Sequence, residues 1–208
     1  MGPTSSRTGR ALVALLCAAL CLQGCGGRRR STPAPLAPPI ASSDFGEMRN
    51  VSLVGRLWFG AVPAAGDLAL ARRRGVARVI DLTSPSERSA EDLAAECKRL
   101  GLEYLGGVIR GEDPQGDDSV DLVLPWLAAA DAAADAPWTL LFDGTGGRCA
   151  AYLAIHRAVV RGVPVEEALV EARRAGMKPG VLEDFVREQV ARLASGDPGG
   201  VSEPAPAG

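Results

Sequence analysis

The chain has 208 residues, of which 47% are hydrophobic and 4% aromatic, and its 23 Lys+Arg and 25 Asp+Glu residues give a formal charge of −2. A pI near 5.5 argues against a nucleic-acid-binding surface, since such surfaces are strongly basic. The apolar content is enough for one hydrophobic core, which excludes a chain that is disordered throughout.

The N-terminal segment, residues 1–24, is predicted to be an export signal. Arg7 and Arg10 precede an uncharged apolar run at 11–22, which is too short to cross a bilayer comfortably. The run leads into Leu-Gln-Gly-Cys at 22–25, which resembles the lipobox of bacterial lipoproteins. The resemblance implies cleavage before Cys25 and a palmitate-bearing lipid on its side chain. The alternative is an ordinary cleaved signal, which would leave the protein free in the periplasm or secreted.

The predicted organisation after the signal is a tether, one domain and a tail. Residues 25–48 comprise the lipidated cysteine and a Pro-rich tether, 49–195 the domain, and 196–208 a disordered tail. Cleavage removes two arginines, so 23 − 2 = 21 basic residues face 25 acidic ones, a charge of −4. Gly26 replaces the Asp that retains some lipoproteins at the inner membrane. The lipoprotein resemblance therefore favours the outer membrane, with the domain facing the periplasm.

Hydrophobic periodicity and turn residues divide the domain into alternating strands and helices. Strands are predicted at residues 51–53, 56–59, 76–82, 104–109 and 139–142, and helices at 64–74, 89–100, 119–134, 149–161, 164–175 and 179–194. This alternation predicts an α/β fold with a central, mostly parallel sheet flanked by helices. The last three helices are expected to cover one face.

The turn at 143–148 joins the last predicted strand directly to a helix. Glycines allow backbone N–H groups to turn inward, a helix N-terminus favours negative charge, and an arginine can bind two oxygens of an anion. The predicted anion-binding residues are Gly144, Thr145, Gly146, Gly147 and Arg148. The alternative is a tight strand-to-helix connection with an exposed arginine.

Four further segments resemble one enzyme family in their order and spacing. They are Leu-Trp-Phe-Gly-Ala-Val-Pro at 57–63, Gly-Val-Ala-Arg-Val-Ile-Asp-Leu at 75–82, Gly-Leu-Glu-Tyr at 101–104 and Pro-Val-Glu-Glu-Ala-Leu at 164–169. With the turn, residues 56–193 resemble the dual-specificity (cysteine-dependent tyrosine) phosphatase superfamily in its compact bacterial form. This resemblance implies that superfamily's α/β fold.

The family's signature loop is His-Cys, four or five residues, Arg, and Ser or Thr. When Arg148 is aligned on the signature arginine, Asp143 takes the cysteine position with four-residue spacing, and Phe142 takes it with five. Cys149 takes the Ser/Thr position. The resemblance thus implies the family's fold with its nucleophilic cysteine replaced.

Loss of the cysteine removes the thiolate that attacks phosphorus. A carboxylate at Asp143 would repel a phosphate dianion unless it were protonated. The sequence therefore predicts a pseudophosphatase that binds an anion, such as a phosphorylated ligand, or a protein partner, with no cofactor and no metal. The alternatives are a hydrolase that uses protonated Asp143 or Cys149, and a scaffold whose pocket binds nothing.

The family's general acid is an Asp on a loop, and the polar loop at 111–118 offers Asp113 as the candidate, with Glu112, Asp117 and Asp118 as alternatives. A solvated turn is the simpler interpretation of that loop.

Several other residues have a simpler structural interpretation. Cys149 could be a reactive thiol at a helix N-terminus, but a small core residue is the better expectation. The compartment permits a disulfide between Cys97 and Cys149, although it is not favoured. His156 is the only histidine and cannot form a metal site or triad by itself. The tryptophans are expected to pack in the core; they are Trp58, Trp126 and Trp138.

Overall fold

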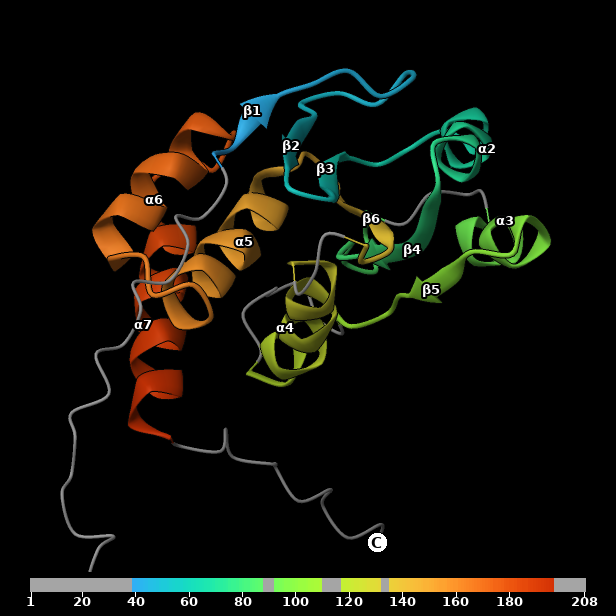
Figure 1. The fold of residues 1–208 in the computed structure, drawn as a ribbon. Coiled ribbons are helices and arrows are strands. Elements are labelled where there is room, and N and C mark those ends of the chain that lie inside the picture. The colour runs from blue at the N-terminus through green and yellow to red at the C-terminus, as the bar shows by residue number, and fades with distance from the viewer. Residues whose placement is uncertain (1–38, 88–91, 110–116, 132–134, 197–208) are drawn as a thin grey trace, which may run out of the picture. The chain divides into compact units, whose positions relative to one another are not determined.

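The computed structural model describes residues 39–87, 92–109, 117–131 and 135–196 (Figure 1). The strands are β1 (Ala41–Ser42), β2 (Ser52–Val54), β3 (Leu57–Ala61), β4 (Val76–Asp81), β5 (Glu103–Leu105) and β6 (Trp138–Asp143). The helices are α2 (Ala65–Arg73), α3 (Leu93–Leu100), α4 (Asp117–Asp131), α5 (Gly147–Val159), α6 (Val165–Arg174) and α7 (Val181–Ser195). The predicted signal peptide, Cys25, Asp113 and nearly all of the predicted tail lie outside the described residues.

The strands form one mixed sheet in the order β1-β2-β3-β6-β4-β5. The pairs β1–β2 and β2–β3 are antiparallel, whereas β3–β6, β6–β4 and β4–β5 are parallel. The predicted α/β class with a mostly parallel central sheet is therefore confirmed. Because parallel strands end at the same edge of a sheet, the segments that follow β3, β4 and β6 meet there.

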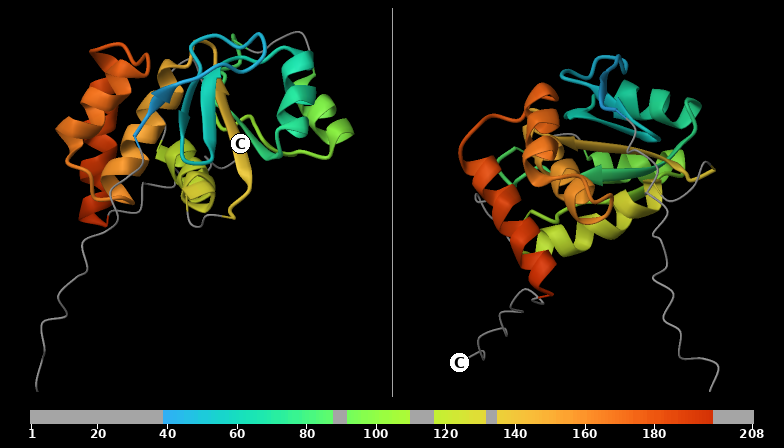
Figure 2. Two further views of the ribbon diagram at one scale, coloured as in Figure 1. Left: turned by 45° about the horizontal axis from the view of Figure 1, so that its top comes forward. Right: turned by 60° about the vertical axis from the view of Figure 1, so that its left-hand side comes forward.

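Alternating side chains of the central strands pack into two hydrophobic clusters. Phe59 and Leu141 join a cluster with α4, α5, α6 and α7, whereas their neighbours Trp58 and Leu140 join a cluster with α2 and α3. This alternation follows from the two-residue period of a β-strand. The helices therefore cover both faces of the sheet (Figure 2).

The three last helices share one side of the sheet, as predicted, but they do not all lie against it. Helix α5 lies between the sheet and the pair α6 and α7 (Figure 1). Residues 149–157 are all buried, because α5 is covered by the sheet on one side and by helices on the other. The helix that follows the glycine-rich turn is thus the centre of the larger cluster.

The fold begins earlier in the chain than the predicted boundary at residue 49. Strand β1 pairs with β2 through Ala41 and Ser42, and Phe45 is fully buried in the smaller cluster. A two-residue strand has no periodicity that a sequence can show, so long-range pairing alone defines it.

Strand β5 is shorter than its predicted range, 104–109. It ends at Leu105, and Gly106 and Gly107 follow it directly, the latter at φ +69°. A residue at such a φ cannot continue a β-strand.

The buried cysteines lie in different clusters, on opposite faces of the sheet. Cys97 belongs to the cluster with α2 and α3, and Cys149 to the cluster with α5; both are free thiols. The disulfide considered from the sequence is therefore absent. In the described part of the chain, no helix combines the length and apolar character needed to cross a membrane.

Candidate functional site

The turn predicted to carry the chemistry follows β6, which lies between β3 and β4 in the sheet. Gly146 has φ +92°, and a methyl group added to it would lie 3.2 Å from the carbonyl carbon of Gly60 on β3. Only glycine combines this backbone conformation with such a close approach to a neighbouring strand. Residues 143–148 therefore form a tight loop that leads directly into α5.

The centre of this loop holds the carboxylate of Asp143, which is 2% exposed. Its Oδ1 accepts hydrogen bonds from the backbone N–H groups of Thr145 and Gly146, at 2.7 and 2.8 Å. Its Oδ2 accepts from the N–H of Cys149 at 2.7 Å. These donors belong to the loop and the first turn of α5, where unpaired N–H groups favour an anion. In this protein that anion is one of its own side chains.

A second carboxylate, that of Glu87, lies against the same loop. Its Oε2 accepts from Nη1 of Arg148 at 2.9 Å and from the backbone N–H of Ser84 at 2.9 Å. A methyl group on Gly144 would come within 2.5 Å of Oε1 of Glu87. Burial raises the pKa of Glu87, but the hydrogen bond from Arg148 and that from Ser84 outweigh this effect and hold the pKa below its ordinary value.

Arg148 is the residue predicted to bind an incoming anion, and its side chain is only 12% exposed. Its Nη1 donates both to the backbone carbonyl of Leu82 and to Glu87. The guanidinium group is thus held against the segment that follows β4. An external anion would compete with Glu87 for this side chain.

Cys149 is fully buried beneath the loop, and its thiol donates to the carbonyl oxygen of Gly60 at 3.8 Å. Burial raises its pKa well above the ordinary value, and the nearby Asp143 carboxylate raises it further. A thiol in this state is a poor nucleophile, because the thiolate is the reactive form. The structure therefore favours the expectation of a small core residue over that of a reactive thiol.

The structure brings Asp143 and all five predicted anion-binding residues into one loop. It also adds two residues that the sequence analysis did not select. Glu87 lies in a Ser-x-x-Glu segment, residues 84–87, where a Glu side chain commonly returns to a backbone N–H, and that local signal was available. Asn50, at φ +55°, donates from Nδ2 to the carbonyl of Thr145 at 2.9 Å. No local sequence pattern predicts this contact, because the two residues are 95 positions apart.

Other predicted residues lie away from the loop or outside the described residues. Asp113 and Glu112 lie outside the described residues. Trp58 and Trp138 stack in the smaller cluster at 4.3 Å, which confirms core packing for that pair. Among the described residues, no three His, Cys, Asp or Glu side chains are grouped as a metal ion requires.

The fold is that of protein-tyrosine and dual-specificity phosphatases. Tk-PTP in its active form aligns with a TM-score of 0.57 and 22% identity, over 69% of this chain and 98% of that protein. TpbA of P. aeruginosa aligns with a TM-score of 0.56 and 22% identity, over 76% of this chain and 98% of TpbA. The kinase-associated phosphatase KAP, in a form with its catalytic cysteine changed to serine, aligns with a TM-score of 0.56 and 15% identity, over 67% and 88%. No protein-family model and no curated protein sequence matches the chain.

Proposed function

We propose that this chain is a lipid-anchored protein of the bacterial cell envelope whose phosphatase-like domain is a non-catalytic module that binds a protein partner. The observation that carries the proposal is the Asp143 carboxylate, which takes three N–H donors of the loop. In an active phosphatase of this fold, the corresponding loop must be open to a phosphate group.

Catalysis requires a nucleophile at the base of the loop, and the described residues provide no accessible thiol there. Cys149, the cysteine of the loop region, is buried and has a raised pKa. The resemblance assigns the family's cysteine position to Asp143 with four-residue spacing and to Phe142 with five, and neither residue is a thiol. A carboxylate there repels a phosphate dianion, and the repulsion is strong where water is excluded. Hydrolysis is therefore not expected.

A protein partner is favoured over a free anion, because two carboxylates of the protein itself already accept hydrogen bonds from the loop. Asp143 accepts from three backbone N–H groups, and Glu87 accepts from Nη1 of Arg148. A cysteine-to-serine variant of TpbA has been crystallised in complex with pTyr. A phosphorylated group is accordingly the anion that we expect this loop to take once both carboxylates are removed.

Calorimetric titration with tungstate, a phosphate-like anion, tests the closed loop. Wild type is expected to show no saturable binding, because an entering anion would meet two carboxylates. The double variant Asp143→Ser/Glu87→Gln is expected to bind tungstate, and the addition of Arg148→Ala should abolish that binding. Arg187→Gln, which changes an exposed arginine paired with Glu166, is the matched control.

The competing activity is tested with p-nitrophenyl phosphate. Turnover by wild type that disappears in Arg148→Ala would overturn the non-catalytic assignment in favour of a hydrolase with an unusual nucleophile. Saturable tungstate binding to wild type that needs Arg148 would instead show that the loop is an open anion site.

The membrane attachment rests on the sequence at 22–25, which lies outside the described residues. Cys21, which lies inside the predicted signal, provides the control variant. Incorporation of labelled palmitate should be lost in Cys25→Ser and kept in Cys21→Ser. Equal labelling of both variants would contradict lipid attachment at Cys25.

A further inference from the structure

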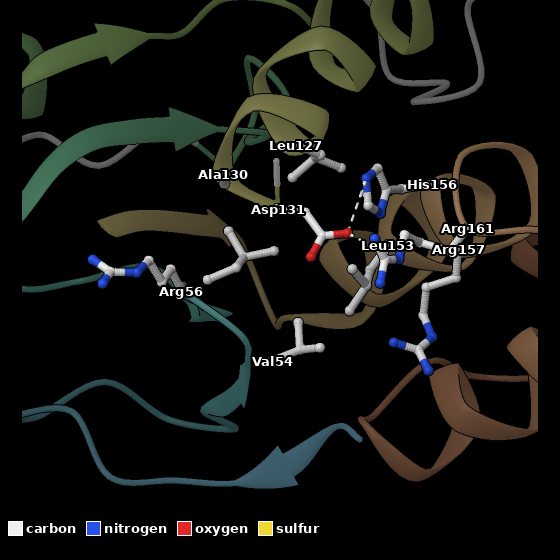
Figure 3. A pocket seen from close by; sticks show the side chains of 10 residues that line it. Val54, Arg56, Leu127, Ala130, Asp131, Leu153, His156, Arg157 and Arg161 are labelled. Atoms are coloured by element: carbon white, nitrogen blue, oxygen red, sulfur yellow. Dashed lines mark ion pairs between the residues drawn. The ribbon is translucent and has the colours of Figure 1, made fainter. Parts of the chain in front are cut away.

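A second group of charged side chains lies at the opposite edge of the sheet from the 143–148 loop. It is located where α4 and α5 end, beside the turn between β2 and β3, and it surrounds a cavity of about 20 Å³ (Figure 3). His156 lies nine positions after Gly147 on α5, a rise of about 13.5 Å along the helix axis. The lining residues are Val54, Arg56, Leu57, Leu127, Ala130, Asp131, Leu153, His156, Arg157 and Arg161.

His156 is the central polar group of this cavity and is 3% exposed. Neither imidazole nitrogen has a hydrogen-bond partner in the part of the chain that the structure describes. The nearest carboxylate oxygen, Oδ2 of Asp131, is 4.0 Å from Nε2, which is too long for a hydrogen bond. Buried polar groups of native proteins are nearly always satisfied, so a group from outside the described chain is expected at this imidazole.

The charge of the lining favours an anion. Three arginines and one carboxylate are among the lining residues. Nε of Arg161 lies 3.3 Å from Oδ2 of Asp131, and Figure 3 shows that carboxylate directed at both Arg161 and His156. Arg157 is paired with Glu171 on α6, and Arg56 donates to the carbonyl of Ala136 while lying over the Trp138 ring.

The size and the apolar walls restrict the kind of anion. Five of the ten lining residues are aliphatic. A cavity of about 20 Å³ admits roughly one water-sized group, so a single oxygen can enter while the rest of a ligand stays at the mouth. A dianion such as phosphate is disfavoured, because the Asp131 carboxylate lies 4.0 Å from the buried His156 and would repel a second negative charge there.

We propose that this cavity is a binding site for a short-chain monocarboxylate. One carboxylate oxygen enters the cavity and accepts from His156 and from Arg161, and the short aliphatic tail stays at the mouth. Asp131, whose side chain is 25% exposed, turns toward solvent and gives up Arg161 to the ligand. The site is separate from the 143–148 loop and does not depend on the function proposed for that loop.

The single histidine of the chain allows a direct test by NMR, because every imidazole signal of the full mature protein comes from His156. Butyrate is the probe, titrated at constant pH and ionic strength, and 1-butanol, which has the same tail without the charge, is the control. A saturable shift of the imidazole signal with butyrate and none with 1-butanol is expected. The absence of a saturable shift would overturn the proposal and would be the result if a bound water already satisfies His156. An equal shift with 1-butanol would also overturn it.

Two variants distinguish this site from a nonspecific effect of the anion. Arg161→Gln should weaken butyrate binding about ten-fold, the loss expected for one charge-assisted hydrogen bond. Asp131→Asn should strengthen binding, because it removes the internal competitor for Arg161. Arg187→Gln, at an exposed arginine on α7, should leave the affinity unchanged. Unchanged affinity in both Arg161→Gln and Asp131→Asn would show that butyrate does not bind here.

Discussion

Burial changes the protonation of His156, a residue for which the sequence indicates no special role. Burial lowers its pKa to about 4; the Asp131 carboxylate acts in the opposite direction, and Arg161 and Arg157 lower the pKa further. In the unfolded chain the pKa returns to the ordinary value of histidine, 6.5. The neutral imidazole is therefore the form that the fold accommodates.

The low pKa of His156 predicts a loss of stability in mild acid. Between pH 6.5 and 4 the unfolded chain binds a proton that the folded chain does not, so the free energy of unfolding falls as the pH drops through this range. The expected loss between pH 7 and pH 5 is about 2 kcal/mol. Urea unfolding at these two pH values measures it, and His156→Leu should remove this part of the pH dependence. An equal loss in the variant would assign the effect to other groups.

The role of Asp143 in the 143–148 loop also depends on its surroundings in the fold. An aspartate at the end of a strand is commonly exposed, but Asp143, the last residue of β6, is buried and accepts three backbone hydrogen bonds. Its position in the chain was singled out from the sequence. The bonds that hold its carboxylate depend on how the loop folds back over it.

The connection between β6 and α5 depends on the close contact between the loop and β3. At Gly146 an alanine would have both an unfavourable φ of +92° and a methyl group 3.2 Å from the backbone of Gly60. Gly162, with φ +67° and no atom within 4 Å of an added methyl group, has only the first problem. The two positions therefore form a matched pair.

Substitution of each glycine by alanine should separate backbone strain from steric overlap. Gly162→Ala should lower the free energy of unfolding by about 1 kcal/mol, and Gly146→Ala by roughly 2–4 kcal/mol. Chemical denaturation of both variants provides the comparison. Equal losses would mean that the loop moves away from β3 without a penalty.

The sheet and its two clusters make one fold out of segments that are far apart in the chain. The N-terminal segment around Phe45 belongs to this fold, although it lies within the range predicted as tether, 25–48. Phe45 is fully buried, its ring lies 5.1 Å from that of Trp58, and the Arg74 guanidinium lies 4.9 Å from its ring centre. Strand β1, immediately before it, forms one edge of the sheet.

Phe45→Ala tests whether this segment contributes to the stability of the fold. The loss should be about 3–5 kcal/mol, as for a large side chain removed from a core. Leu122→Ala, at a 45% exposed position on α4, should change stability by less than about 0.5 kcal/mol. Thermal or urea unfolding measures both. A small effect of Phe45→Ala would show that the segment packs on a domain that is already complete without it.

Local patterns in the chain were sufficient for the fold class, the order of the longer strands and helices, and the loop at 143–148. The reason is that hydrophobic runs, glycines and helix periodicity act over a few residues. They could not reveal β1, because a two-residue strand exists only through its pairing with β2.

Contacts between distant segments required the tertiary structure. Glu87 and Arg148 are 61 residues apart, and Asp131 approaches His156 from another helix. Local sequence patterns do not predict which acidic side chain pairs with which basic one. These pairs depend on which loops the parallel strands bring to a common edge of the sheet. The residues of the loop, and the local hydrogen bonds that Asp143 accepts within it, lie close together in the chain. The pairing of Glu87 with Arg148 was decided by the tertiary structure, because the sheet places the segment after β4 beside the segment after β6.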